Sequence, residues 1–236
     1  MMKHKQYRFL NHLWDKESGL SGMFILLFIM HFVLIPLFSS YSSFMVVLNI
    51  FWMLVLVAGI ISLAKSRKQA FLYSIVPFLF VLFGWITVFE HTPFVLFADI
   101  FFTIATFLLL IVLVLIKVFE PGPITEYRVI GSIVVYLILA NLWGVIYLYI
   151  YEHIPGSFSL TLPPFESNSI QANFLYFSYI TITTTGFGEI VPLHPFARAM
   201  VQVEALIGVL YPVILIGRLV SDANENKAKS KSKPNQ

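Results

Sequence analysis

The segment from Thr181 to Glu189 carries the strongest chemical signal in the chain, and it reads T-I-T-T-T-G-F-G-E. Gly186 and Gly188 alternate with larger residues, and glycine adopts a positive φ at little cost. Alternating backbone handedness turns successive carbonyl groups toward the same side. The hydroxyl of Thr184 adds a further oxygen at the inner end. We infer that this strand presents a row of oxygens able to replace the water around a cation.

The composition indicates an integral membrane protein. Of the 236 residues, 58% are hydrophobic and only 11% are charged, whereas a soluble domain has roughly 25% charged residues. The chain has no cysteine, so it has no disulfide framework. The net charge of +3 is too small to favour nucleic acid as a partner. No nucleophile and base stand out as a pair, so we expect neither an enzyme nor an organic cofactor.

Six apolar runs reach the roughly 20 residues that a helix needs to cross a bilayer. A shorter run at about 171–182 is long enough only for a re-entrant half-crossing, and the polar stretch between Glu152 and Ser169 indicates an exposed turret. We therefore expect an all-α transmembrane fold of six spans plus one re-entrant helix. The six runs lie at about 20–38, 44–64, 71–90, 93–118, 128–151 and 195–220.

The basic residues indicate the orientation of the chain. If the N-terminus is cytoplasmic, fourteen of the fifteen basic residues lie inside, and Arg198 is the exception. Basic residues concentrate in cytoplasmic loops. We therefore expect a plasma (cell inner) membrane protein with both termini in the cytoplasm and with Glu189 at the outer mouth.

Residues 181–189 resemble the selectivity filter of the potassium channel family, whose usual form is T-V-G-Y-G-D. Thr185 stands at the valine position, Phe187 at the tyrosine and Glu189 at the aspartate. The resemblance is to the bacterial six-span type with a single pore loop, and it covers about residues 128–221. It implies that K⁺ binds to main-chain oxygens of the filter, with the Thr184 hydroxyl closing the innermost site. The implied filter residues are Thr184, Thr185, Gly186, Phe187 and Gly188.

Other positions fit the same resemblance. Tyr176 precedes Gly188 by twelve residues, where the family often has an aromatic residue that bonds the acidic residue after the filter, here Glu189. Gly208 lies twenty residues beyond Gly188, which is the spacing of the inner-helix hinge glycine, and Pro212 follows one turn later. Phe187 lacks the tyrosine hydroxyl, which removes one bond that braces the filter from behind.

Several residues of the last span remain open to more than one interpretation. Glu204 is expected behind the filter, where it braces the pore helix or bonds a threonine hydroxyl, but a carboxylate at a subunit contact is an equally good interpretation. Gly208 is either a bending point with Pro212 or a site of close helix packing. Ile216 and Val220 are candidates for an inner gate that closes by dewetting.

Because the chain holds one filter strand and a ring of carbonyls needs four, the sequence implies a homotetramer. We predict a potassium-selective channel that conducts passively, with K⁺ ions in the filter. Two alternatives stay open. One is a non-selective cation channel on the same fold. The other is a potassium-uptake transporter subunit, although such proteins carry several pore loops in one chain.

Residues 20–118 resemble a voltage sensor of four helices, but without gating charges. The fourth span contains no arginine and only Lys117 at its inner end, whereas steep voltage dependence needs several charges, each contributing about 2.3 kcal/mol per 100 mV. The other expected segments are a cytoplasmic N-terminus, a linker, a pore domain and a disordered basic tail that attracts anionic membrane lipid. Their boundaries are 1–19, 119–127, 128–220 and 221–236.

Three polar residues lie at a similar depth, each about five to seven residues from the outer end of its span: His31, Asn49 and Asp99. A His31–Asp99 pair would respond to protons, because histidine titrates near neutral pH. The favoured interpretation is a polar contact that holds the bundle together. A metal site is less expected, since no third good ligand is evident.

Overall fold

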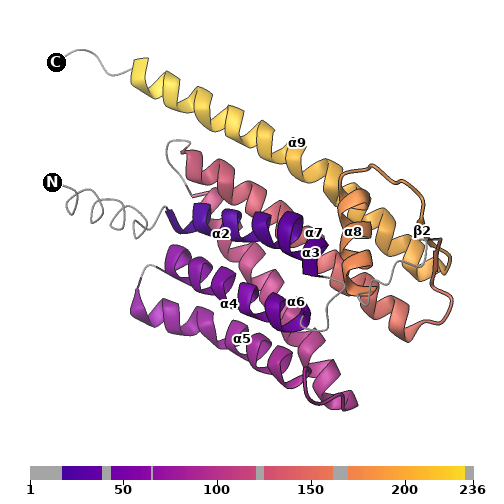
Figure 1. Ribbon diagram of the computed structural model, residues 1–236. Coiled ribbons are helices and arrows are strands. Elements are labelled where there is room, and N and C mark those ends of the chain that lie inside the picture. Colours follow the sequence, from indigo (N-terminus) through magenta and orange to yellow (C-terminus); the bar gives the residue numbers. More distant parts are fainter. Residues whose placement is uncertain (1–17, 39–43, 65, 121–124, 162–169, 232–236) are drawn as a thin grey trace.

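The computed structural model describes residues 18–38, 44–64, 66–120, 125–161 and 170–231, and it is a bundle of helices (Figure 1). Nearly all of the described residues are helical, because the apolar runs satisfy their backbone hydrogen bonds within one segment. In chain order the elements are α2 (Ser18–Ile29), η1 (Met30–Leu34), α3 (Ile35–Phe38), α4 (Phe44–Leu63), α5 (Arg67–Ile86), α6 (Pro93–Val118), α7 (Glu126–His153), β1 (Phe158–Leu160), α8 (Ile170–Ile182), β2 (Ile190–Pro192) and α9 (Pro195–Lys231).

The described residues contain five helices that are long and apolar enough to cross a membrane. α4 is a further apolar helix, and its searched part covers Val46–Ile60. The all-α transmembrane fold predicted from the sequence is confirmed, and the chain is an integral membrane protein. The five candidate spans are Gly19–Phe38, Arg67–Ile86, Pro93–Val118, Glu126–His153 and Pro195–Arg218.

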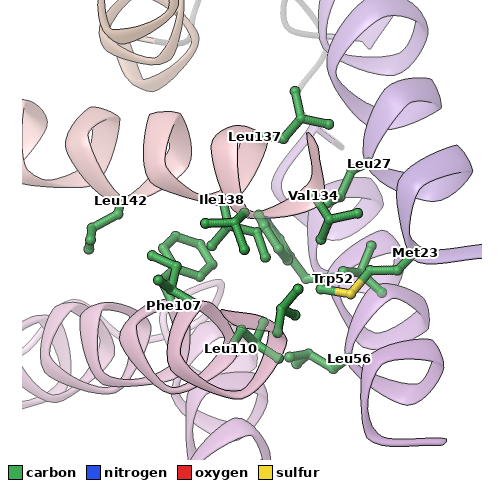
Figure 2. Close-up of a cluster of buried hydrophobic side chains, with 14 of the residues drawn as sticks. Met23, Leu27, Trp52, Leu56, Phe107, Leu110, Val134, Leu137, Ile138 and Leu142 are labelled. Atoms are coloured by element: carbon green, nitrogen blue, oxygen red, sulfur yellow. The ribbon is translucent and has the colours of Figure 1, made fainter. Parts of the chain in front are cut away.

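One hydrophobic core joins the front helices to the first helix of the pore half. Figure 2 shows side chains from α2, α4, α6 and α7 meeting in this cluster. The rings of Trp52 and Phe107 lie 4.8 Å apart at its centre, and Ile138 of α7 is fully buried beside them. The front helices and α7 therefore share packing across the expected linker 119–127, of which 121–124 lie outside the described residues.

The first span is irregular where it passes the pore half. The five residues of η1 form a π-helix between α2 and α3, and His31 lies within it. Pro36 follows in α3. Proline lacks a backbone N–H and crowds the preceding turn, which explains why the helix is locally widened here. Such segments often place a functional side chain.

The segment after α7 is only partly the exposed turret that the sequence predicts. Ser157 and Phe158 are buried, and β1 pairs antiparallel with β2, with Ser159 opposite Val191. The aromatic ring of Phe158 packs against buried rings of α7 and α8, so the chain is held against the bundle there. Residues 162–169 of the expected turret lie outside the described residues.

The C-terminal tail also differs from the prediction. We expected disorder from Ser221, but α9 continues as a helix to Lys231 and extends beyond the other helices (Figure 1). Alanine, glutamate and lysine in this stretch favour a helix, and extension of an existing helix avoids the cost of nucleation. Residues 232–236, and residues 1–17 of the expected N-terminal segment, lie outside the described residues.

Candidate ion-conduction site

The backbone from Thr184 to Gly188 alternates in handedness. Thr184 has φ 58°, Gly186 φ 57° and Gly188 φ 94°. A side chain in this left-handed region costs roughly 1–2 kcal/mol, and glycine avoids that cost. The alternation turns successive carbonyl groups to the same side of the strand. The sequence indicated this conformation at the two glycines but gave no sign of it at Thr184.

The amide groups of the same strand bond back to the end of α8. Thr184 N donates to Thr181 O at 2.9 Å. The amides of Thr185 and Gly186 both donate to Ile180 O, at 2.8 and 3.1 Å. The last turn of α8 therefore uses its free carbonyl groups to hold the strand by its N–H groups.

The carbonyl groups of the strand remain available. Those of Thr184 to Phe187 accept no hydrogen bond from any residue that the structure describes. Residues 183–188 are exposed in the single chain, and Phe187 is 71% exposed. A row of bare carbonyl oxygens next to bonded amides fits a dehydrated cation, which needs oxygen ligands to replace its water.

The Glu189 end of the strand is hydrogen-bonded on two sides. The hydroxyl of Tyr176 on α8 donates to the carboxylate of Glu189, as the sequence predicted. Thr161, just after β1, donates to Glu189 O from its backbone N–H at 2.8 Å and from its hydroxyl at 3.0 Å. Glu189 therefore connects the strand to both α8 and the segment after α7.

Glu204 of α9 is fully buried and joins three helices. Its Oε2 accepts from the Tyr147 hydroxyl of α7, and its Oε1 lies 2.5 Å from Ser178 Oγ of α8. The Ser178 hydroxyl also lies 2.8 Å from Ala140 O. Glu204 thus braces α8, and it is not a surface carboxylate in this chain.

We expect Glu204→Ala to lower the stability of the protein by about 1–3 kcal/mol, because the buried Tyr147 hydroxyl loses its acceptor and the Ser178 hydroxyl keeps only Ala140 O. Glu204→Gln keeps one carbonyl oxygen at the same place and should cost only about 1 kcal/mol. Thermal unfolding of the purified variants in detergent measures both effects. Equal melting temperatures for Glu204→Ala and the unchanged protein would contradict a bracing role.

Gly208 allows α9 to touch the end of α8. A Cβ on Gly208 would lie 2.8 Å from the carbonyl carbon of Ile182 and closer still to its oxygen. The same Ile182 oxygen accepts from the Tyr136 hydroxyl of α7 at 2.8 Å. Of the two interpretations that the sequence left open, the contact supports close packing at Gly208, and α9 continues as a helix through Gly208 and Pro212.

The candidate inner gate is described only in part. Ile216 is 60% exposed in the single chain, whereas the side chain of Val220 lies outside the described residues. Arg218 lies between them, and its guanidinium stands 4.5 Å from the ring centroid of Phe119 at the end of α6. This cation–π contact connects the inner end of α9 to the front half of the chain.

The His31–Asp99 pair considered above does not form. Nδ1 of His31 lies 2.6 Å from Leu27 O, and Nε2 lies 2.9 Å from Asn141 Oδ1. The physical reason is that α2 packs against α7, which carries Asn141, whereas Asp99 on α6 faces a cavity. His31 is buried, and its ring meets that of Tyr179 on α8 edge-on at 5.4 Å.

Comparison with known proteins agrees with this geometry. The family model described as "Ion channel" matches residues 135–223, from within α7 to within α9. Residues 135–223, named here the ion channel region, resemble an ion channel. The ion channel region includes α8, the filter-like strand and the buried Glu204, and the match supports passive ion conduction. No curated protein and no solved structure matches the chain.

Sequence reasoning missed several residues that hold the ion channel region together. Tyr136, Tyr147 and Ser178 each bond a group far away in the sequence. Their types are common in membrane helices, and no local spacing marks them. Their partners could be identified only once the helices were placed beside one another.

Proposed function

We propose that this chain forms a potassium-selective channel in which four copies surround one conduction path. K⁺ is the transported ion, and the carbonyl oxygens of Thr184, Thr185, Gly186 and Phe187 are its ligands. The Thr184 hydroxyl closes the innermost site, and Gly188 ends the row at the outer mouth. No catalytic step is involved, since the ion moves down its own gradient.

The observation that carries this proposal is that the amide groups of the strand are hydrogen-bonded whereas its carbonyl groups are not. The amides of residues 184–186 are bonded to α8, while the carbonyls of residues 184–187 accept no bond from the described residues. Carbonyl oxygens replace the hydration shell of K⁺ in selective pores. If the strand served only to pack the helices, these carbonyl acceptors would have neither a hydrogen-bond donor nor a cation in the membrane.

Assembly into a homotetramer follows from the same requirement. One chain supplies one strand, and a ring needs four. The apolar side chains of α9 that face away from the bundle suit contact with other copies. Those that are exposed in the single chain include Leu206, Val209, Val213, Ile214 and Ile216.

The front half is proposed as a scaffold without gating charge. Lys117 is the one basic residue of α6, and its ammonium group donates to Ser62 O at 2.7 Å. A charge held in this way does not cross the membrane field. The basic end of α9 is proposed to face anionic lipid on the cytoplasmic side, and both termini are placed there by the positive-inside rule.

Selectivity is tested by reversal potentials of the purified full chain in planar bilayers, with K⁺ on one side and Na⁺ on the other. We expect a shift toward the K⁺ equilibrium potential that corresponds to at least about a hundredfold preference for K⁺, because carbonyl ligands discriminate between the two ions. A reversal potential near zero would favour the non-selective cation channel on the same fold. The number of copies is measured in parallel by native mass spectrometry, and a monomer would overturn the proposal.

A further inference from the structure

A cavity of about 440 Å³ lies between the front helices and the ion channel region. α4, α5 and α6 line one side of it, and α7 and α8 line the other. Exposed residues stand at its mouth, where α5 joins α6 and where α7 ends. The proposed conduction path does not use this cavity, since the filter strand does not line it.

Two oxygen atoms from different helices converge inside the cavity. Asn49 Oδ1 lies 3.3 Å and Asp99 Oδ1 lies 3.6 Å from the position that a Cβ would take on Gly84. The missing side chain of Gly84 leaves this space open. Among the described residues, Asp99 makes no hydrogen bond and no ion pair, and it is only half-buried.

The neighbouring polar groups leave both oxygens as acceptors. Asn49 Nδ2 donates to Gly84 O at 2.7 Å, and the Thr87 hydroxyl donates to the same oxygen at 3.0 Å. These bonds orient the amide of Asn49 so that its Oδ1 points to the open space. The space over Gly84 therefore offers hydrogen-bond acceptors, one of them charged, to a group that can donate.

The rest of the wall is apolar and aromatic. Trp52, Phe80 and Phe107 line the cavity and pack edge to face or tilted against one another. Aromatic faces attract cations as well as apolar groups. The lining includes no lysine and no arginine.

We propose that this cavity binds a small hydrophobic primary amine in its ammonium form. The ammonium group donates to Asp99 and Asn49 over Gly84, and the apolar part of the molecule lies against Trp52 and its neighbouring rings. A bare metal ion suits the site poorly, because the described residues contain no group of three or more metal-ligating side chains. A phospholipid suits it poorly too, because no lysine or arginine lines the cavity to pair with a phosphate.

The amine would touch the ion channel region directly. Leu175 of α8 lines the cavity and lies against Gly144 of α7, where a Cβ would come within 3.1 Å of the Leu175 backbone. α8 in turn holds the filter strand by its last carbonyl groups. Binding can nevertheless be measured without any current, so the test below does not depend on the proposed conduction of K⁺.

The test is a titration of the purified full chain in detergent with 2-phenylethylammonium at neutral pH, followed by the tryptophan fluorescence. The neutral analogue 2-phenylethanol has the same size and shape. We expect the ammonium probe to bind at least about tenfold more tightly than the alcohol, because a charge-assisted hydrogen bond is roughly twice as strong as a neutral one. Equal binding of the two probes to the unchanged protein would overturn the proposal without any variant.

Variants then locate the site. Asp99→Asn should weaken ammonium binding about tenfold and leave alcohol binding unchanged, and Gly84→Ala should weaken it by filling the space between the two oxygens. Glu152→Gln removes an exposed carboxylate at the mouth and should change the affinity less than about twofold. An unchanged affinity in Asp99→Asn would overturn the assignment. Displacement of the probe by phosphatidylethanolamine, but not by phosphatidylglycerol, would overturn the free amine as the ligand.

Discussion

We expect Gly186→Ala to abolish potassium-selective flux while leaving the protein folded. Gly186 has φ 57°, and an alanine there costs roughly 1–2 kcal/mol unless the backbone rotates away from this conformation. The rotation would turn away one of the carbonyl groups that we propose as ligands of the ion. A Cβ at this position meets no atom within 4 Å in the single chain, so the effect comes from the backbone conformation and not from a collision within the chain.

Gly156→Ala is a matched control for this substitution. Gly156 has φ 73°, and a Cβ there also meets nothing within 4 Å, but it lies in the loop after α7. Both variants carry similar backbone strain, and only one of them alters the filter strand. K⁺ flux into proteoliposomes, with Na⁺ as the competing ion, separates them. Selective flux that survives in Gly186→Ala, or that is lost equally in Gly156→Ala, would count against the proposed ion path.

The second large effect is expected at Gly208. Replacement by alanine places a methyl group against the Ile182 carbonyl, and overpacking typically costs about 1–3 kcal/mol, with the upper end expected against backbone atoms. Ile182 O also holds Tyr136, so the displacement reaches α7 as well as the start of the filter strand. We expect both a lower melting temperature and weaker K⁺ selectivity.

Gly217→Ala provides the comparison in the same helix. A Cβ on Gly217 meets nothing within 4 Å, and alanine favours a helix over glycine by roughly 0.8–1.0 kcal/mol. Its melting temperature should therefore stay the same or rise. If Gly208→Ala were as stable and as selective as Gly217→Ala, the contact with Ile182 would have no role in positioning the filter.

Two hydrogen-bonded contacts near the filter-like strand show what the sequence could and could not suggest. The bond between Tyr176 and Glu189 is local to one loop and its two flanks, and the family resemblance suggested it from a fixed spacing along the chain. The brace at Glu204 is different, since its partners Tyr147 and Ser178 lie 57 and 26 residues away. A buried carboxylate needs hydrogen-bond donors, but the sequence does not say which of many hydroxyl groups will supply them.

His31 illustrates the same limit. Similar depth in the membrane suggested Asp99 as its partner, but depth does not say which neighbouring helix a side chain faces. The rotation of the first span about its axis and its packing against α7 decide which polar group the His31 imidazole contacts. In the structure, His31 contacts Asn141, whereas Asp99 lines the cavity between the front helices and the ion channel region.

The amino-acid sequence was enough to indicate the approximate limits of the apolar helices and the oxygen-rich strand between α8 and β2. These features depend on hydropathy and on glycine spacing, which act within a few turns of the chain. Only the tertiary structure decided the acceptors for buried hydroxyl groups, the close approach at Gly208 and the opening of a cavity onto Asp99. The reason is that each of these depends on how helices distant in the sequence rotate and pack against one another.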